Sequence, residues 1–253
     1  QGCSSIQGTK QDVLPSGILA MASLSAPTFA ELNNGTFGGF DKDLGVVTLT
    51  NGKWQGKPYI EGSHVRPEVT LLENFRLTGD LDRDGIEEAV VLLNYCPGGT
   101  GHLLHVAVVG RNKGKPKNIA TALVGDRVQI RGGRIVVSGI DRQILLDVVR
   151  GGPQDAACCP GEVTTIGWIL GADKVLKSFS VLNKPTRLTL STIGEVEWVL
   201  KAWSFDDQVP ANPEITLIYR NGRFTGKGGC NRFFAPVKDG DMPGDISVGL
   251  AGS

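Results

Sequence analysis

The sequence predicts a mainly β (α+β) protein, with an antiparallel β-rich N-terminal domain followed by a small β domain. Its apolar runs are short and rich in β-branched residues, and few stretches carry the 3.6-residue period of a helix. The chain contains 35 Gly and 13 Pro in 253 residues, which favours short strands joined by tight turns. A hydrophobic content of 40% at this length is enough to bury a substantial core.

Strands are expected along most of the first 181 residues. Asn51-Gly52 and Gly132-Gly133 each predict a tight hairpin turn between two of them. One short helix is expected over 26–33, with Ser25 as its N-cap and Pro27 in its first turn. The expected strands are 46–50, 87–95, 103–109, 127–131, 134–138, 144–149, 163–170 and 175–181.

A domain boundary is predicted near Lys184-Pro185, so that residues 26–185 form the first domain and 186–253 the second. In the second domain Asn221-Gly222 predicts another hairpin turn. The strands expected there are 188–192, 196–203, 214–219 and the segment that begins at Arg223.

The second domain contains a specific motif, Gly-Gly-Cys-Asn-x-Phe, preceded by a Trp-Val-Leu element. Together these resemble the META domain, the module of the heat-inducible outer-membrane lipoprotein family, over residues 188–253. A META domain usually continues to a second cysteine that pairs with the one in the motif. Here the sequence stops first, so the resemblance implies an incomplete domain in which that cysteine lacks its partner. The motif residues are Trp198, Gly229, Cys230 and Asn231.

The first residues, Gln1-Gly2-Cys3, resemble the end of a bacterial lipoprotein signal, in which a small residue precedes a lipidated cysteine. Residues 1–25 are then a tether between the lipid on Cys3 and the folded body. This resemblance implies a cell-envelope protein of the periplasm, anchored to the outer membrane. The alternative is that Cys3 is an ordinary cysteine.

Cys96, Cys158 and Cys159 are disulfide candidates, because several thiols in an oxidising periplasm should not all stay free. A bridge from Cys96 to one of the adjacent pair is the simpler geometry, since a disulfide between neighbouring residues closes a strained ring. The alternative is that Cys158 and Cys159 act together as a redox switch or soft-metal clamp.

An acidic loop, Asp80-Leu-Asp-Arg-Asp-Gly-Ile-Glu-Glu88, has the oxygen spacing of a calcium loop. It resembles the loops of EF-hands and, because a strand follows, more closely those of integrin-type repeats. No carboxylate stands at its twelfth position, which is Val91. The alternative is an acidic turn whose Asp side chains bond to backbone amides. The predicted calcium ligands are Asp80, Asp82, Asp84, the Ile86 carbonyl and Glu88.

The enzyme hypothesis rests on the three histidines, His64, His102 and His105. His102 and His105 are three residues apart, which on a strand places them on opposite faces and argues against a shared metal. A Cys96/His102 nucleophile and base pair across the glycine-rich 97–101 loop is the basis of a hydrolase alternative that uses the Cys96/His102/His105 segment. No established catalytic motif is present, and no catalytic residue is assigned.

The charge balance completes the functional hypothesis. Lys and Arg total 26 and Asp and Glu total 26, so the net charge is zero, and no electrostatic basis for nucleic-acid binding exists. The sequence thus favours a non-enzymatic, lipid-anchored envelope protein with a binding or structural role and a structural calcium site. Its partners would be the membrane, through the lipid, and an envelope protein or ligand that the sequence does not identify.

Overall fold

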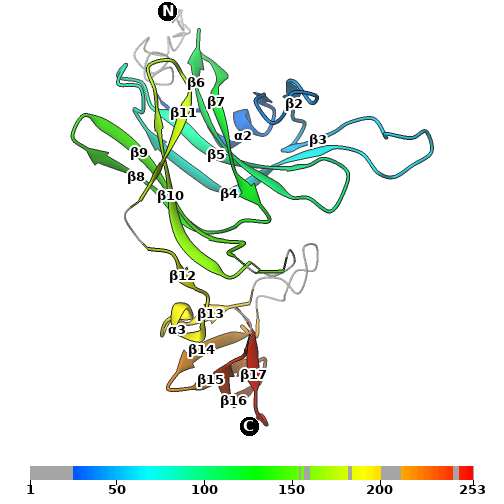
Figure 1. Cartoon of the computed structure of the whole chain (residues 1–253), viewed down its shortest axis with the longest axis vertical. Coiled ribbons are helices and arrows are strands. Elements are labelled where there is room, and N and C mark those ends of the chain that lie inside the picture. The colour runs from blue at the N-terminus through cyan, green and yellow to red at the C-terminus, as the bar shows by residue number, and fades with distance from the viewer. Residues whose placement is uncertain are drawn as a thin grey trace, which may run out of the picture.

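A computed structural model describes residues 25–153, 155–156, 160–181, 184–200, 212–241 and 245–252 of the chain (Figure 1). The mainly β prediction is confirmed: three antiparallel sheets and one small two-stranded sheet hold most of the described residues. Neither described helix has the length or the apolar content needed to span a lipid bilayer.

The first sheet has the strand order β3-β4-β5-β6-β7 and forms the centre of the molecule. Its strands are joined in sequence order by hairpin connections, as expected for a meander. Nearly every residue of β5 and β6 is buried, so this sheet is covered on both faces. Its strands are β3 (Lys53–Gln55), β4 (Glu68–Gly79), β5 (Glu88–Cys96), β6 (Leu103–Asn112) and β7 (Lys115–Asp126).

One face of the first sheet is covered by the N-terminal segment. This segment consists of α2 (Phe29–Leu32) and the small sheet of β1 (Thr36–Phe37) and β2 (Val47–Thr48). Apolar side chains from the two layers form a single buried cluster. Its members include Leu32, Phe37, Leu49, Val69, Leu71, Val91, Leu93, Tyr95 and Val109.

The other face of the first sheet packs against the second sheet, which has the order β11-β10-β9-β8 with β12 also paired to β10 (Figure 1). The alternate residues of β5 and β6 enter this second cluster, which includes Val90, Leu92, Val106, Val108, Ile144, Leu146, Val148 and Trp168. The strands of the second sheet are β8 (Gln129–Ser138), β9 (Asp141–Arg150), β10 (Glu162–Leu170), β11 (Leu176–Ser180) and β12 (Thr186–Arg187).

Two details of the predicted first domain are wrong. Gly132-Gly133 does not form a hairpin, because β8 runs through it with a bulge between Ile130 and Gly132. A Cβ atom at Gly133 would lie 2.7 Å from the ring of Phe75, so the glycine lets the β4 side chain pack closely. The helix is also shorter than the expected 26–33, because it spans only Phe29–Leu32 and its N-cap is Thr28, not Ser25.

The third sheet has the order β13-β14-β15-β16-β17 and its own small core of Leu190, Phe224 and Val237. In Figure 1 it lies beyond β12, at the C-terminal end of the long axis. The Asn221-Gly222 hairpin is confirmed, since both residues have positive φ angles of 51° and 72°. The division of the chain after residue 185 stays a prediction. The strands are β13 (Trp198–Val199), β14 (Thr216–Arg220), β15 (Arg223–Gly228), β16 (Asn231–Asp239) and β17 (Ile246–Val248).

The strand expected over 188–192 is wrong, because Leu190–Ile193 forms the helical turn α3. The Leu190 amide donates to the Asp239 carboxylate at 2.7 Å, which satisfies one of the amides at the start of this turn. Leu190 itself is buried in the small core. A side-chain contact from a distant strand therefore decided this conformation.

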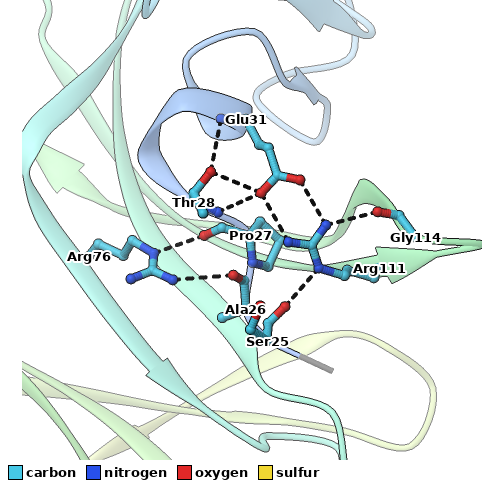
Figure 2. A network of polar contacts seen from close by, with 8 residues as sticks. All are labelled: Ser25, Ala26, Pro27, Thr28, Glu31, Arg76, Arg111 and Gly114. Carbon is cyan, nitrogen blue, oxygen red and sulfur yellow. Dashed lines mark hydrogen bonds and ion pairs between the residues drawn. The ribbon is translucent and has the colours of Figure 1, made fainter. Parts of the chain in front are cut away.

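Two arginines hold the start of the described chain against the first sheet (Figure 2). Arg76 on β4 donates from Nε to the Pro27 carbonyl at 2.9 Å. Arg111 on β6 donates from Nε to the Ser25 carbonyl at 2.7 Å and from Nη1 to Glu31 Oε1 at 2.8 Å. The Arg111 side chain is only 7% exposed, so it needs these partners to offset its desolvation.

Glu31 also completes the cap of α2. Its Oε2 accepts from the Thr28 amide at 2.8 Å, and Thr28 Oγ1 accepts from the Glu31 amide at 3.4 Å, which is a capping box. The hydrogen bond from Arg111 is the largest cause that lowers the pKa of Glu31 to about 2. One carboxylate therefore joins the helix cap to the central sheet.

The low Glu31 pKa predicts an acid-dependent loss of stability. Its stabilising effect is present above the ordinary value of 4.5 and is lost as the pH falls towards 2. We expect Arg111→Gln to lower the free energy of unfolding by about 2 kcal/mol at pH 7, after allowance for solvent screening of the carboxylate, and to flatten its pH dependence between about 5 and 2. Denaturant unfolding at several pH values measures both effects.

Arg220→Gln is the matched control, because the Arg220–Glu195 ion pair is exposed, with both side chains at 60%. It should change stability by less than about 0.5 kcal/mol. Equal effects of the two substitutions would contradict the role assigned to Arg111.

Candidate functional site

The acidic loop forms the connection between β4 and β5. β4 ends at Gly79 and β5 begins at Glu88, so the loop is held at both ends by paired strands of the central sheet. Arg83 and Gly85 have positive φ angles of 64° and 85°, which turn the backbone sharply within a few residues. The strand pairing thus brings the first and last carboxylates of the loop close together.

Three of the predicted ligands form one group. Asp80, Asp82 and Glu88 each offer a carboxylate oxygen, and these oxygens all lie within 4.8 Å of one another. Two oxygens on opposite sides of a calcium ion are separated by about 4.8 Å, since each Ca–O distance is about 2.4 Å. The group is partly buried and able to hold a metal ion.

Glu88 is the most buried member of the group, with an exposed fraction of 2%. Its Oε2 accepts from the Leu81 amide at 2.7 Å. Burial is the largest cause that raises the pKa of Glu88 to about 7, and the negative charges of Asp82 and Asp84 add to it. A cation bound beside Glu88 would lower its pKa again, because the positive charge stabilises the ionised carboxylate.

The Asp80 carboxylate also points to a bound cation. Its Oδ2 accepts from the Gly85 amide at 3.3 Å, but its Oδ1 is buried and has no hydrogen-bond partner. A buried carboxylate oxygen without a partner costs free energy, and a bound cation is one way to satisfy it. The donor set therefore fits a hard metal ion.

Asp84 lies outside the group. Its Oδ1 accepts from the Ile86 amide at 2.8 Å, which is the turn contact that the alternative interpretation predicts. Asp82 makes a similar contact, accepting from the Asp84 amide at 3.2 Å. The loop thus combines both hypotheses, with turn contacts on its outer side and three converging carboxylates on its inner side.

The sequence did not identify Lys174, which lies in the turn between β10 and β11. Its ammonium group forms an ion pair with Asp82 Oδ2, and this contact raises the pKa of Lys174. The pair links the acidic loop of the first sheet to the second sheet. No local pattern could have revealed it, because 92 residues separate the partners.

Cys96 and His102 are in contact, as the hydrolase alternative requires. The distance between Cys96 Sγ and His102 Nδ1 is 3.1 Å. Asn94, which the sequence analysis did not single out, places its Nδ2 3.4 Å from Sγ. Burial raises the pKa of the Cys96 thiol, and the Asn94 hydrogen bond lowers it.

His105 is not part of this contact. It is buried on the opposite face of the sheet, where its ring lies 5.2 Å from that of Phe40 and 6.3 Å from that of Tyr95. Burial lowers the pKa of His105, which favours the neutral form. The predicted separation of His102 and His105 is confirmed, and His105 belongs to the core.

The remaining predicted residues divide into two groups. Cys3, Cys158 and Cys159 lie outside the described residues, so the predicted disulfide between Cys96 and one of the adjacent pair stays a prediction. In the described part of the chain Cys96 is a free cysteine. In the third sheet, Gly229 and Cys230 form the turn between β15 and β16 at Asn231, and Cys230 is exposed and free. Trp198 lies on the edge strand β13, opposite Leu217.

Comparison with known proteins adds no family: no family model, no curated protein and no solved structure matches this chain. The resemblance of 188–253 to the META domain therefore stays a prediction. The class that the fold and site define is an antiparallel β protein with a partly buried acidic group that could hold a metal ion.

The high Glu88 pKa predicts that stability in metal-free buffer falls as the pH rises. The folded state holds the Glu88 proton more tightly than the unfolded state, so stability is full below about 4.5 and declines until the pH passes about 7. The loss is roughly 3 kcal/mol. We expect Glu88→Gln to remove this decline, as measured by denaturant unfolding with chelator present.

Glu87→Gln is the matched control, because Glu87 is the exposed neighbour on the same loop. It should leave the pH dependence of stability as in the wild type. If the stability of the wild-type protein depends on pH no more than that of Glu88→Gln, then ionisation of Glu88 does not destabilise the fold and the prediction is wrong.

Proposed function

We propose that this protein has a structural or binding role in the cell envelope and that the acidic loop binds a calcium ion that stabilises its fold. The observation that carries the proposal is the convergence of Asp80, Asp82 and Glu88, with carboxylate oxygens within 4.8 Å of one another. The buried Asp80 Oδ1 without a partner supports it independently. Both features concern the position of oxygen atoms, which is what a hard cation recognises.

Calcium fits this loop better than magnesium does. Calcium accepts six to eight oxygens at 2.3–2.6 Å in flexible geometry, whereas magnesium needs a near-ideal octahedron at about 2.1 Å. Three carboxylates from one loop, with oxygens within 4.8 Å of one another, suit the ion that tolerates irregular geometry. Waters and the Ile86 carbonyl, which the loop spacing predicts as a ligand, would complete the coordination.

The ion would act on the fold because of where the loop lies. The Asp82–Lys174 pair already connects the β4–β5 and β10–β11 turns, and Glu88 begins β5, nearly all of whose residues are buried. An ion at this position neutralises the carboxylates at the edge of the core. It binds only the folded state, so its binding energy adds to stability.

The calcium proposal predicts a metal-dependent melting temperature. With free calcium at about 100 times the dissociation constant, linkage contributes about 2.7 kcal/mol. For a chain of this size that corresponds to a rise of about 5–10 °C. Thermal unfolding of the whole chain after chelator treatment, with added calcium or magnesium, measures it. Magnesium should produce a smaller rise.

Substitutions in the loop distinguish a specific site from general charge screening. Asp82→Asn should abolish the calcium response, whereas Asp84→Asn should retain most of it, because Asp84 lies outside the group. Lys174→Gln should strengthen calcium binding, since the ammonium competes for Asp82. An unchanged melting temperature in calcium and chelator, or equal losses from Asp82→Asn and Asp84→Asn, would contradict the proposal.

The envelope location rests on Gly2-Cys3, whose resemblance to a lipoprotein signal supports acylation of Cys3. We expect palmitate labelling of the wild-type protein in a bacterial host with lipoprotein processing and membrane association of the labelled product. Cys3→Ser should remove both, and Cys230→Ser, at an exposed thiol of the third sheet, is the matched control. Labelling that survives Cys3→Ser would overturn the anchor.

A further inference from the structure

The end of the β5–β6 hairpin brings a thiol and an imidazole together. Tyr95 pairs with Leu103 in this ladder, so Cys96 and His102 occupy the next pair of opposite positions. Side chains opposite each other in an antiparallel pair lie on the same face and within reach. The hairpin register thus explains the 3.1 Å distance between Cys96 Sγ and His102 Nδ1.

Asn94 determines how the two groups share a proton. Its Nδ2 amide donates to Cys96 Sγ at 3.4 Å and lies 3.4 Å from His102 Nδ1. An amide nitrogen can only donate, so Nδ1 is the acceptor in this arrangement and the neutral ring carries its proton on Nε2. The single lone pair of Nδ1 faces both donors, and the Cys96 thiol, at 3.1 Å, is nearer than the Asn94 amide, at 3.4 Å, so Nδ1 can accept the thiol proton.

The backbone of His102 is held by the end of β7. The His102 amide donates to Asp126 Oδ1 at 2.9 Å, and the Arg127 amide donates to the His102 carbonyl at 2.8 Å. Arg127 also donates from Nη2 to the Thr100 carbonyl at 2.8 Å. These contacts hold the His102 backbone opposite Cys96, while the His102 side chain is exposed.

Two exposed apolar side chains lie against the loop that follows Cys96. The Tyr59 hydroxyl donates to the carbonyl of Pro97, the next residue in the chain, at 2.7 Å. The side chains of Tyr59 and Val65 lie against Gly98, since a Cβ there would come within 2.7 Å and 3.2 Å of them. Tyr59 is 62% exposed and Val65 is 49% exposed. An apolar chain attached to Cys96 Sγ reaches these side chains only if it is several carbons long.

We propose that Cys96 and His102 form a nucleophilic thiol site that accepts an acyl group with an apolar chain from an activated ester. The Cys96 thiol proton moves to His102 Nδ1 as Sγ bonds to the carbonyl carbon of the ester. The carbon–oxygen bond to the leaving group then breaks, and the alkoxide takes the proton from Nδ1. The products are a thioester on Cys96 and a free alcohol, and no oxidant or metal is required.

The general base is needed because of the environment of the thiol. Burial and the nearby Glu68 charge both raise the pKa of Cys96, so the thiol is largely protonated near neutral pH. Unassisted attack would therefore be slow. A disulfide from Cys96 and thiol chemistry at Cys96 are mutually exclusive, so this site functions in the reduced protein.

The test compares two thiols within one molecule. The full-length protein is reduced, freed of reductant and treated with p-nitrophenyl octanoate or p-nitrophenyl acetate, and acylation of each cysteine is followed by peptide mass spectrometry. Cys230, which is exposed and free, is the internal reference. We expect Cys96 to be acylated at least about tenfold faster than Cys230 with octanoate, and to favour octanoate over acetate more than Cys230 does.

Variants assign the roles. His102→Gln should lower the Cys96 rate at least about tenfold without changing the Cys230 rate. His64→Gln, which replaces an exposed histidine on the β3–β4 connection, should leave both rates unchanged. Tyr59→Ser should reduce the preference for octanoate. The melting temperature and the Cys230 rate of each variant report whether it is folded.

Three outcomes would overturn the proposal. The first is a wild-type Cys96 that reacts no faster than Cys230. The second is a folded His102→Gln variant that retains the wild-type rate at Cys96, which would make the contact purely structural. The third is an equal preference for octanoate at both cysteines, which would show that the site does not recognise an apolar acyl chain. None of these three outcomes depends on calcium, so the cation site is tested separately.

Discussion

The register of the β5–β6 hairpin is the constraint on which the rest of the structure depends. Both strands are buried on both faces, so a shift of one residue would exchange the two sets of core side chains. The same register places Glu88 at one end of β5 and Cys96 at the other. At about 3.3 Å per residue these ends are about 26 Å apart, which makes the acidic group and the thiol pair independent sites.

The polar groups at the edges of this sheet follow from its burial. A sheet covered on both faces has few places for charged side chains, and each one needs partners when it loses water. Arg111 obtains them from the N-terminal segment, and Asp82 from Lys174. Asp80 and Glu88 are less well compensated, because one has a buried oxygen without a partner and the other a strongly raised pKa. This imbalance distinguishes the acidic loop from an ordinary turn.

Distant segments meet at each of these polar contacts. Arg76 and Arg111 join β4 and β6 to the residues that precede α2 (Figure 2). Lys174 joins the second sheet to the first, and Arg131 on β8 donates to the Thr192 carbonyl of α3 at 2.9 Å. The apolar clusters hold the layers together, but hydrophobic packing is not directional. The hydrogen bonds and ion pairs are directional, so they fix how the connecting segments lie on the sheets.

The sequence alone determined the fold class, most strand positions and the tight turns at Asn51-Gly52 and Asn221-Gly222, where all four residues have positive φ angles. These features were predictable because alternation, β-branched residues and Asn-Gly pairs act locally. It also identified Asp80, Asp82 and Glu88 as candidate ligands, whose carboxylates do converge, and Cys96 with His102 as a pair, since each set lies within one hairpin. Only the tertiary structure decided that Gly133 continues a strand, that Leu190 begins a helical turn and that Asp84 stays outside the acidic group. It alone revealed Lys174 beside Asp82. Each of these depends on side chains that pack or pair across sheets, and such contacts leave no periodic signal in the sequence.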